Sequence, residues 1–302
     1  MAKKYLELFL QGGLGNQLIQ CAYASSLSRR ANLPVTVNPV LLSRTWALFR
    51  RISYRRRSYF VDLLLEARHG TAVQFLSLLL LKLPLSRASA CFDDLCDAQT
   101  LRLIHKTQSS VRLFGYFQRR QAFDSSSRHF WSVLADCLLQ QQLVVDPFPH
   151  GQIALHVRLG DYLLPENKRL FVHQPLEQLL QLAFSWSRRM GGSSLIHIIT
   201  DDPATLRDQL SPEWSCKTKI LEGGSAEADF LLLARHRHIV ASNSTFSLCA
   251  GRLSAELWGF PKTTLRPTRW YVDESLNNAF DAELRACSFC FTAEELCLSE
   301  AT

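Results

Sequence analysis

Short apolar runs alternate along the chain with longer stretches in which apolar side chains recur at helical spacing. In the N-terminal half, residues 4–10 and 33–38 have the pattern of strands, and residues 15–31 between them have the pattern of a helix. The C-terminal half contains three further strand patterns bounded by turn residues, at 152–158, 194–200 and 237–242. Because strands and helices alternate, the pattern predicts parallel sheets covered by helices on both faces.

The clearest break in this pattern lies at residues 144–152, where Pro147 and Pro149 interrupt the periodicity on either side. The chain has 302 residues, which is long enough for two domains of about 150 residues each. We therefore predict an α/β fold with two Rossmann-like domains, 1–146 and 147–302, that face each other across a ligand cleft. Ligands of open parallel sheets bind at the carboxyl ends of the strands, so candidate site residues are expected there.

The composition, 47% hydrophobic and 20% charged, is that of a soluble globular protein. The apolar stretch near the N-terminus is interrupted by Glu7 and Gln11, which argues against a signal peptide or a membrane anchor. The most apolar segment, residues 75–85, contains Lys82 and Pro84 and is shorter than the roughly 20 residues of a membrane span. We expect it to be a buried helix of a cytoplasmic protein, with peripheral contact at a membrane surface as the alternative.

Arginines are concentrated in one part of a chain whose net charge is +7. The densest patch interleaves aromatic side chains with Arg50, Arg51, Arg55, Arg56 and Arg57. Guanidinium groups bind phosphates and aromatic rings stack on bases, so RNA binding is one interpretation of this patch. A sugar nucleotide or an acidic glycan is a second candidate ligand, and a solvated basic loop is the interpretation without function.

The nine cysteines are an odd number, and with no export signal they argue against a disulfide framework. Cys287, Cys290 and Cys297 cluster near the C-terminus, and the first two form a CxxC pair. A single CxxC without a second pair at ligand spacing is a weak zinc signal, and we expect no bound metal. Buried or free thiols are the favoured interpretation.

The first predicted strand runs into the sequence GGLGNQLIQCA at residues 12–22. Aligned to the dinucleotide fingerprint, Gly13 and Gly15 match, but Leu18 stands where the third glycine belongs. The acidic residue expected about 20 residues later is also missing, so a nicotinamide or flavin cofactor is disfavoured. The cluster is then either a turn that lets Asn16 and Gln17 approach a ligand, or a tight turn with Asn16 as the helix N-cap.

The strand ALHVRLGDY, residues 154–162, carries charge at its carboxyl end. In an extended chain, His156 and Arg158 lie on the same face and are expected to point toward the ligand. An arginine at this position can donate two hydrogen bonds to a phosphate. The alternative is a structural ion pair between Arg158 and Asp161.

Two further strand ends carry small polar or acidic residues. Asp201 and Asp202 follow one strand and precede Pro203, so Asp202 is either a ligand contact or the N-cap of a helix. The next strand runs into a cluster of small polar residues and a phenylalanine, Ser242, Asn243, Ser244, Thr245 and Phe246. Hydroxyl and backbone N–H groups at a helix start form an anion site, and capping alone needs only one such residue.

Five motifs in fixed order resemble one family: GGLGNQLIQCA at 12–22, GYFQ at 115–118, HVRLGDY at 156–162, TDD at 200–202 and SNSTFS at 242–247. The set resembles the glycosyltransferase family 11 α-1,2-fucosyltransferases, and more distantly the protein O-fucosyltransferases and α-1,6-fucosyltransferases. The resemblance implies a GT-B type fold, GDP-β-L-fucose as donor, no cofactor, inversion at the anomeric carbon and no divalent metal. It also implies a galactose-containing glycan as acceptor, joined through O2.

The resemblance implies a role for each matching residue. Arg158 would clamp the diphosphate, and Ser244, Thr245 and Phe246 would hold the β-phosphate. Asn243 would be a further donor-binding residue. His156 and Asp202 would face the guanosine. Gly13, Gly15, Asn16 and Gln17 would lie on the acceptor and fucose side, with Asn16 near the reacting sugar, and Asp161 is the candidate base.

The chain departs from the family pattern at Leu159, where an arginine is common, and at Leu248 and Cys249, where tryptophans are usual. These changes put acceptor specificity in doubt more than donor chemistry. We therefore predict an inverting, metal-independent α-1,2-fucosyltransferase. The alternatives are a GDP-sugar transferase of other regiochemistry, such as an α-1,6-fucosyltransferase, an RNA-binding protein that uses the arginine patch, and an inactive sugar-binding relative.

Overall fold

The computed structural model describes residues 4–42, 90–93, 95–144, 146–192, 195–259 and 264–293. The chain divides into two compact units, Met1–Val133 and Leu134–Thr302. This division falls within helix α6 (Arg128–Gln140), upstream of the boundary expected at 146–147, which stays a prediction. The arginine patch at 50–57, the apolar segment at 75–85 and Cys297 lie outside the described residues.

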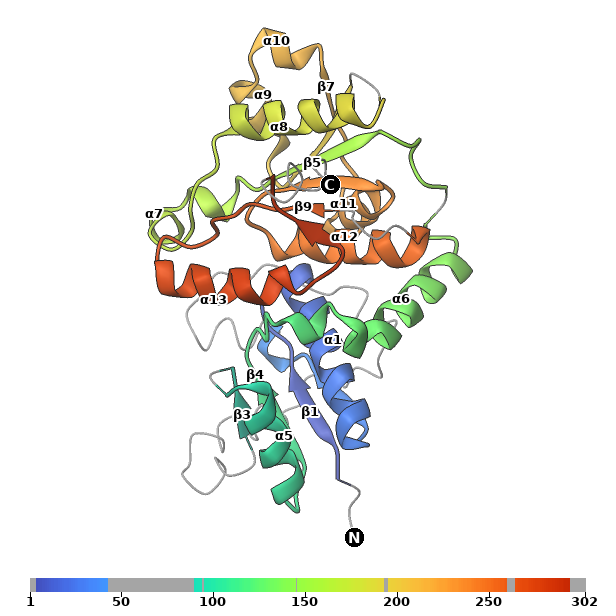
Figure 1. Ribbon diagram of the computed structural model, residues 1–302, viewed down its shortest axis with the longest axis vertical. Helices are drawn as coiled ribbons and strands as arrows, with labels where there is room; N and C mark the ends of the chain where they lie inside the picture. Colours follow the sequence, from blue (N-terminus) through green and yellow to red (C-terminus); the bar gives the residue numbers. More distant parts are fainter. Residues whose placement is uncertain are drawn as a thin grey trace, which may run out of the picture. The chain divides into compact units, whose positions relative to one another are not determined.

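Among the described residues, the first unit contains a four-stranded sheet in the order β2-β1-β4-β3 (Figure 1). All of its described pairings are parallel. The strands are β1 (Leu6–Phe9), β2 (Val35–Asn38), β3 (Ala90–Phe92) and β4 (Val111–Phe114). The helices are α1 (Leu14–Ala31), α5 (Asp97–Lys106) and the first part of α6, with short 3-10 turns η1 (Val40–Leu42), η3 (Arg120–Ala122) and η4 (Ser125–Ser127).

The centre of this unit is β1 and the helix that follows it. Leu6, Leu8 and Phe9 of β1 are fully buried, because parallel strands are covered on both faces. Helix α1 is buried along most of its length, and it ends where Asn32 adopts the left-handed conformation that commonly closes helices. The loop between β1 and α1 is therefore flanked by two buried elements.

The second unit contains a six-stranded sheet in the order β10-β9-β8-β5-β6-β7, again with parallel pairings throughout its described residues. Its strands are β5 (Ile153–Val157), β6 (Ile196–Thr200), β7 (Thr218–Ile220), β8 (His238–Ala241), β9 (Thr264–Leu265) and β10 (Cys290–Phe291). Its helices are η5 (Asp161–Leu163), α7 (Pro165–Lys168), α8 (Leu176–Arg189), α9 (Pro203–Gln209), α10 (Pro212–Ser215), α11 (Ala226–Ala234), α12 (Thr245–Trp258) and α13 (Glu274–Arg285).

Strand β5 shows how helices cover both faces of this sheet. Leu155 and Val157 belong to a buried cluster with Leu179 and other side chains of α8. His156 points to the opposite face, where its ring stacks on Phe246 of α12. The alternation follows from the two-residue period of a strand, and it places different chemistry on the two sides of the same strand end.

The predicted fold class, α/β with two Rossmann-like units as in the GT-B type, is confirmed by the two parallel sheets. The five strands predicted from the apolar pattern are all present, each shorter than predicted by two or three residues. The ligand cleft between the units stays a prediction.

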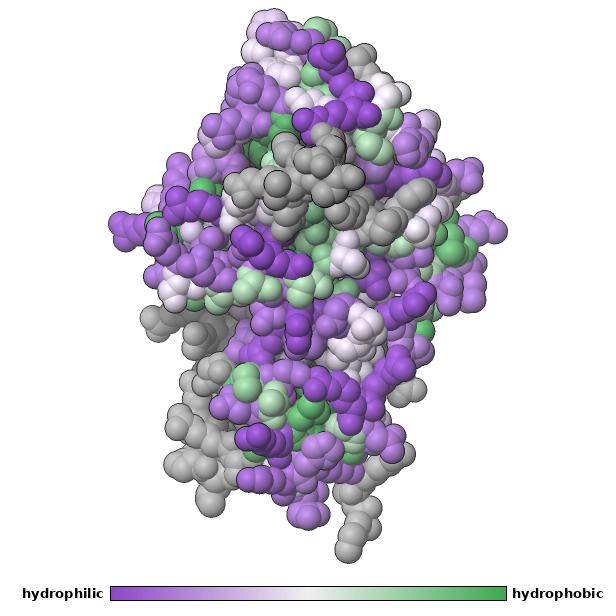
Figure 2. Space-filling model, in the orientation of Figure 1, coloured by the Kyte–Doolittle hydropathy of each residue, from purple (hydrophilic) through white to green (hydrophobic). Residues whose placement is uncertain are grey.

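On the face shown in Figure 2, apolar residues form small separate groups among hydrophilic ones. Among the described helices, none combines the length and the apolar character that crossing a bilayer requires.

Candidate functional site

The topology of the second sheet marks one position for a ligand. Strand β5 lies between β6 and β8, and the chain proceeds from β5 to one side through β6 and β7, then returns to the other side with β8. The loops that leave β5 and β8 therefore depart to opposite faces, and a crevice forms at the carboxyl ends of these two strands. Arg158 follows β5 and Ser242 follows β8. The residues predicted to bind the donor phosphates therefore begin on both sides of this crevice.

Arg158 is held by two carboxylates. Its Nη2 atom lies 2.9 Å from Asp161 Oδ1, and its Nη1 atom lies 3.1 Å from Asp201 Oδ2. The guanidinium also lies 5.7 Å from the centre of the Tyr162 ring. With 29% of its side chain exposed, Arg158 is oriented by the protein and still reachable by a ligand. The predicted ion pair with Asp161 is therefore present, but Asp201 is a second partner.

Asp201 contacts both the Arg158 side chain and the backbone that follows it. Its Oδ1 atom accepts a hydrogen bond from the Leu159 backbone at 2.9 Å, while Oδ2 holds Arg158. A Cβ atom added at Gly160 would lie 2.4 Å from Asp201 Oδ2, a distance that real contacts do not reach. Gly160 is therefore needed because the Asp201 carboxylate packs directly against its backbone.

Asp202 has a local role in the structure. Its two carboxylate oxygens accept hydrogen bonds from the backbone N–H and the hydroxyl of Thr205, at 3.1 and 2.7 Å, which makes Asp202 the N-cap of α9. The same hydrogen bonds lower the pKa of the Asp202 carboxyl below its usual value. Contact between Asp202 and guanosine stays a prediction.

His156 is buried and neutral. Burial and the nearby Arg158 charge lower its pKa to about 3. Its Nδ1 atom lies 3.3 Å from the Ser242 hydroxyl, and its ring stacks on Phe246 with 5.3 Å between ring centres. Phe246 in turn packs edge-on against Phe230 of α11. His156 is thus positioned by rings on its own face of the sheet, and its predicted contact with guanosine is not tested by this packing.

The start of α12 has the character of an anion site. Ser244 occupies the N-cap position, but its side chain does not cap the helix, and the first turn contains no acidic residue. The first-turn amides of a helix have no acceptor within the helix and carry the positive end of its dipole. Thr245 and Phe246 are half-buried here, so the predicted phosphate contacts lie at the helix start that their motif indicated.

Asn243 connects three loops. Its amide nitrogen donates hydrogen bonds to the carbonyls of Val172 and Trp270 at 2.7 and 3.1 Å, and its side-chain oxygen accepts one from Gln174 at 2.7 Å. Its backbone carbonyl accepts a hydrogen bond from the Tyr162 hydroxyl. The side chain predicted to touch the donor therefore holds the surrounding loops, and the sequence did not reveal these partners because they lie far away in the chain.

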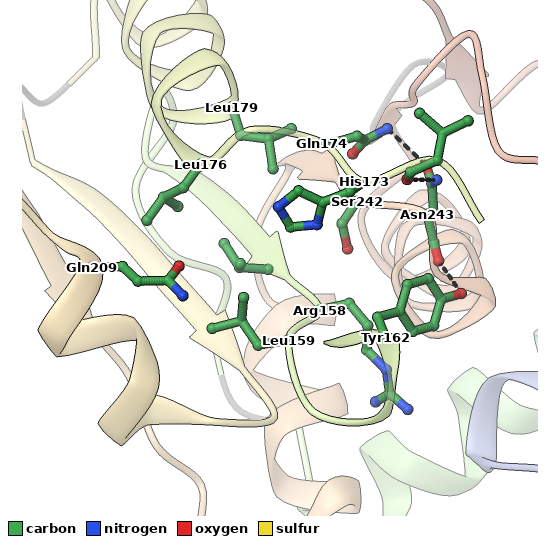
Figure 3. Close-up of a pocket in the computed structure, with 12 residues that line it drawn as sticks. Arg158, Leu159, Tyr162, His173, Gln174, Leu176, Leu179, Gln209, Ser242 and Asn243 are labelled. Carbon is green, nitrogen blue, oxygen red and sulfur yellow. Dashed lines mark hydrogen bonds between the residues drawn. The ribbon is translucent and has the colours of Figure 1, made fainter. Parts of the chain in front are cut away.

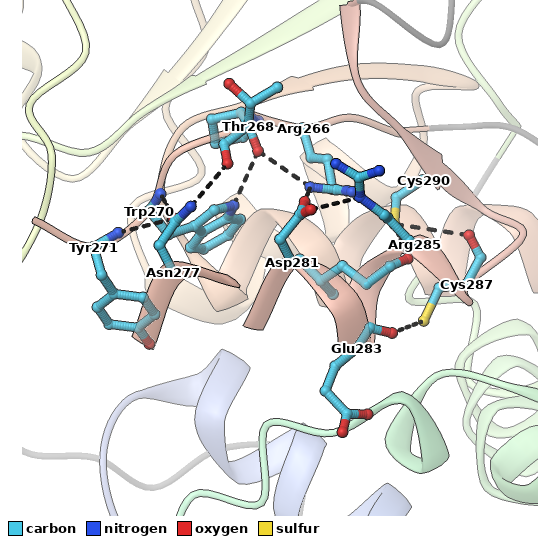
Figure 4. Close-up of polar contacts among 12 residues, drawn as sticks. Arg266, Thr268, Trp270, Tyr271, Asn277, Asp281, Glu283, Arg285, Cys287 and Cys290 are labelled. Atoms are coloured by element: carbon cyan, nitrogen blue, oxygen red, sulfur yellow. Dashed lines mark hydrogen bonds and ion pairs between the residues drawn. The ribbon is translucent and has the colours of Figure 1, made fainter. Parts of the chain in front are cut away.

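Helix α13 supports one of those loops (Figure 4). The side-chain oxygen of Asn277 accepts a hydrogen bond from the Trp270 backbone at 2.8 Å, and its amide donates to the Thr268 carbonyl. The buried Arg266 pairs with Asp281 at 2.7 Å, which joins the end of β9 to α13. The loop that contains Trp270, which Asn243 also contacts, is therefore tied to α13 by hydrogen bonds.

A small pocket opens at this crevice on the α8 side (Figure 3). Leu176, Leu179 and Gln209 line one side of it, and Gln174 and Asn243 line the other. Arg158 and Tyr162 lie at its rim. The lining mixes apolar side chains with about as many polar ones, including an arginine at the edge, which suits a ligand with polar and anionic groups.

In the first unit, the glycine loop is held by glutamines. Gln17 is buried and donates a hydrogen bond to the Gly12 carbonyl at 3.0 Å. Helix α1 begins at Leu14 with Gly13 as its N-cap, so the alternative with Asn16 as N-cap is wrong and Asn16 lies inside the first turn. Asn16 Oδ1 accepts a hydrogen bond from Gln118 Nε2 at 3.1 Å. Gly15 is buried, and nothing lies within 4 Å of a Cβ added at Gly13.

The C-terminal cysteines are buried thiols in the described part of the chain. Neither Cys287 nor Cys290 is in a disulfide, and the Cys290 thiol donates to the Leu284 carbonyl at 3.6 Å. Among the described residues, no cluster of three or more His, Cys, Asp or Glu side chains is arranged to hold a metal ion. Metal independence of the reaction stays a prediction.

Comparisons with known proteins agree with the motifs. A family model, Glycosyl transferase family 11, matches residues 98–283. The chain is similar to an α-1,2-colitosyltransferase from Escherichia coli, with 22% identity over 278 residues, which are 89% of this chain and 93% of that protein. Its fold is similar to POFUT1 in complex with GDP-fucose, with 9% identity, a TM-score of 0.47 and coverage of 88% and 99% of the two chains. It is also similar to the NodZ α-1,6-fucosyltransferase co-crystallised with GDP, with 14% identity, a TM-score of 0.41 and coverage of 82% and 92%.

The family match begins in α5 and ends in α13, so it includes the Arg158 crevice and the turn at 115–118 but not the glycine loop. It covers more than half of the sequence. The chain therefore belongs to glycosyl transferase family 11 and is a glycosyltransferase.

Proposed function

We propose that the chain is an inverting α-1,2-fucosyltransferase that moves L-fucose from GDP-β-L-fucose to O2 of a terminal galactose, without a metal ion. The observation that carries the proposal is Arg158, which two carboxylates hold beside the start of α12 at the crevice between β5 and β8. This arrangement presents a fixed guanidinium and a helix N-terminus to one anionic ligand.

The chemistry of the donor explains why these groups suffice. Breaking the bond between C1 of fucose and the β-phosphate leaves negative charge on GDP, which must be stabilised as it develops. Arg158 supplies a permanent positive charge, and the α12 amides supply oriented hydrogen-bond donors that need no reorganisation. Ser244, Thr245 and Phe246 would bind the β-phosphate.

The remaining steps use residues of both units. Galactose O2 forms a bond to fucose C1 on the face opposite GDP, the C1–phosphate bond breaks, and the O2 proton goes to a base. Asp161 is the proposed base, and it would have to reach the O2 proton on the face of the sugar opposite GDP; its side chain is 36% exposed in the ion pair with Arg158. Asn16 would lie near the sugar that is transferred. Because the transition state resembles an oxocarbenium ion, the base needs to act only late.

Similarity to an α-1,2-colitosyltransferase supports the 1,2 linkage. It also makes GDP-colitose a second candidate for the donor. Colitose is fucose without its 3-hydroxyl group, so both donors have the same leaving group and differ in one hydroxyl on the sugar. The two candidates are therefore distinguished by the sugar, and the Arg158 crevice is expected to serve either.

The test is a transfer assay with the purified chain, lactose as acceptor, and GDP-fucose, GDP-colitose or GDP-mannose as donor. We expect transfer from GDP-fucose, a product linked to O2 of galactose by NMR, an α configuration, and the same rate in EDTA. Arg158→Ala should lower kcat/KM by about 100-fold or more, a loss of about 2.7 kcal/mol of transition-state stabilisation.

Each part of the proposal has its own contrary result. No release of GDP across a panel of galactosides would contradict fucosyl transfer to galactose. Preference for GDP-colitose would show that colitose, and not fucose, is the sugar transferred. A product linked through O6 would contradict the 1,2 linkage. Loss of activity in EDTA would contradict metal independence.

A further inference from the structure

The turn at 115–118, which follows β4, has an unusual backbone. Gly115 has a φ of +150°, and Phe117 has a φ of +49° although it is not a glycine. Positive φ strains a non-glycine residue and persists only where the surroundings impose it. Phe117 is fully buried and stacks on Tyr23 of α1 with ring centres 4.9 Å apart. The turn is thus anchored by an inward-pointing aromatic ring.

Asp93, directly after β3, fixes the same turn from the other side. Its carboxylate accepts hydrogen bonds from the backbone N–H groups of Tyr116, at 2.9 Å, and Phe117, at 3.1 Å. The Arg119 side chain donates to the Asp93 carbonyl at 2.5 Å. A Cβ atom added at Gly115 would lie 2.5 Å from Asp93 Cβ, so the turn and Asp93 are in close contact.

The result of this anchoring is an exposed aromatic ring. Tyr116 is 42% exposed, between the buried Phe117 and the tight Gly115. A Cβ atom added at Gly12 would lie 3.0 Å from Tyr116 Cε1 and 2.8 Å from Asn16 Nδ2. The ring therefore rests against the backbone of the glycine loop, beside the Asn16 amide. Only a residue without a side chain at position 12 lets these two groups approach.

These groups meet at the ligand position of the first sheet. Strand β1 lies between β2 and β4, so a ligand of this sheet is expected at the carboxyl ends of β1 and β4. The hydrogen bond between Asn16 and Gln118 joins the two loops there and fixes the orientation of both amides. The Tyr116 ring and the side-chain amides of Asn16 and Gln118 thus lie together at these strand ends.

We propose that Tyr116, Asn16 and Gln118 form a hexopyranose-binding subsite that takes the terminal galactose of the acceptor. One face of galactose exposes several C–H bonds, which pack on the electron-rich face of an aromatic ring. Its hydroxyl groups both donate and accept hydrogen bonds, and an amide can do the same. The identity of the sugar rests on the proposed function, whereas the shape of the subsite rests on the turn.

The test compares Tyr116→Ala with Tyr116→Phe, which keeps the ring and loses the hydroxyl. Leu170→Ala is the control, because Leu170 is an exposed apolar residue in the other unit. We expect Tyr116→Ala to raise the acceptor KM at least tenfold, while Tyr116→Phe and Leu170→Ala stay within twofold of the unchanged chain. The donor KM and the melting temperature should stay unchanged in all three variants.

Direct binding separates this proposal from the proposed function. Saturation-transfer NMR with methyl β-D-galactopyranoside, in the presence of GDP, should give a signal with the unchanged chain that Tyr116→Ala removes. Calorimetry with GDP tests the donor site alone, so failure to bind GDP contradicts the proposed function and not the subsite. No galactoside signal with the unchanged chain, an unchanged acceptor KM in Tyr116→Ala, or an equal rise of the donor KM would overturn the subsite.

Discussion

At the scale of single residues, Gly160 controls the arginine that the proposed chemistry needs. A Cβ atom at this position would lie 2.4 Å from Asp201 Oδ2, so Gly160→Ala must displace the carboxylate that holds Arg158 Nη1. We expect the affinity for GDP to fall about tenfold, or about 1.4 kcal/mol, because Arg158 loses one of its two fixed partners. Isothermal titration calorimetry measures the change. Asp201→Ala should give a similar loss, and full affinity in both variants would show that Arg158 needs no such support.

Asp202 can be assigned by a matched pair of substitutions. Its carboxylate caps α9 through Thr205, so Asp202→Ala should lower the free energy of unfolding, because alanine leaves the helix uncapped. Asp202→Ser retains an N-cap oxygen and should keep most of that stability. Urea unfolding provides the measurement. If both variants lose GDP affinity, the contact with guanosine predicted from the sequence would be supported instead of capping alone.

The sequence revealed where the polar residues gather, but not which atoms they face. Asp201 and Asp202 are neighbours, and the following proline correctly favoured Asp202 as a helix cap, yet nothing local indicated that Asp201 binds Arg158. Asn243 stands in a motif of small polar residues, and its partners Val172 and Trp270 are more than twenty residues away in either direction. Such contacts depend on the order of strands in the sheet, which periodicity does not determine.

At the scale of elements, histidines gather at the amino edge of the second sheet, opposite the crevice. His197 of β6 hydrogen-bonds to His236 at 2.9 Å, and His236 stacks on Phe148. Within the described part of the chain, His238 of β8 has no hydrogen-bond partner at either ring nitrogen. Burial lowers the pKa of His236 to about 3 and that of His197 and His238 to about 4.

These shifts predict acid sensitivity. The unfolded chain binds protons near pH 6.5, whereas the native histidines stay neutral, so the free energy of unfolding should fall as the pH drops from 6.5 toward 4. For the fully buried His236 the slope approaches about 1.4 kcal/mol per pH unit. The charges that face the group, Lys219, Arg235 and Arg237, disfavour protonation further.

Urea unfolding at several pH values tests this expectation with His238→Phe. The ring of His238 contacts Trp186 and His150 edge-on, so phenylalanine fits its aromatic surroundings and removes the two unpartnered nitrogens. The variant should be more stable than the unchanged chain at pH 5 and should show a shallower slope. His129→Gln, at an exposed histidine, is the control that should leave the slope unchanged. Equal slopes in all three proteins would contradict a role for His238.

At the scale of the whole molecule, the alternation of strands and helices was sufficient to predict two parallel α/β units. Strands β3, β4, β7, β9 and β10 were missed, and all of them except the four-residue β4 contain only two or three residues, too few for a period of two to be recognised. The order of the strands in each sheet could not be predicted from the sequence either. This order decides at which strand ends a ligand is expected. The family was predicted from the motifs at the strand ends, because more polar and charged residues gather there than a simple turn needs.

The proposed donor and acceptor groups lie in different units, which predicts how ligands act on the full chain. Arg158 and the α12 start belong to the second unit, and the Tyr116 turn belongs to the first. GDP alone should therefore slow amide hydrogen exchange at residues 158–163 and 242–247, because binding stabilises the segments it orders. The turn at 115–118 should keep its exchange rate until a galactoside is added. Protection of 115–118 by GDP alone would show that the donor reaches the first unit, and protection of neither segment by GDP would exclude the Arg158 crevice as its site.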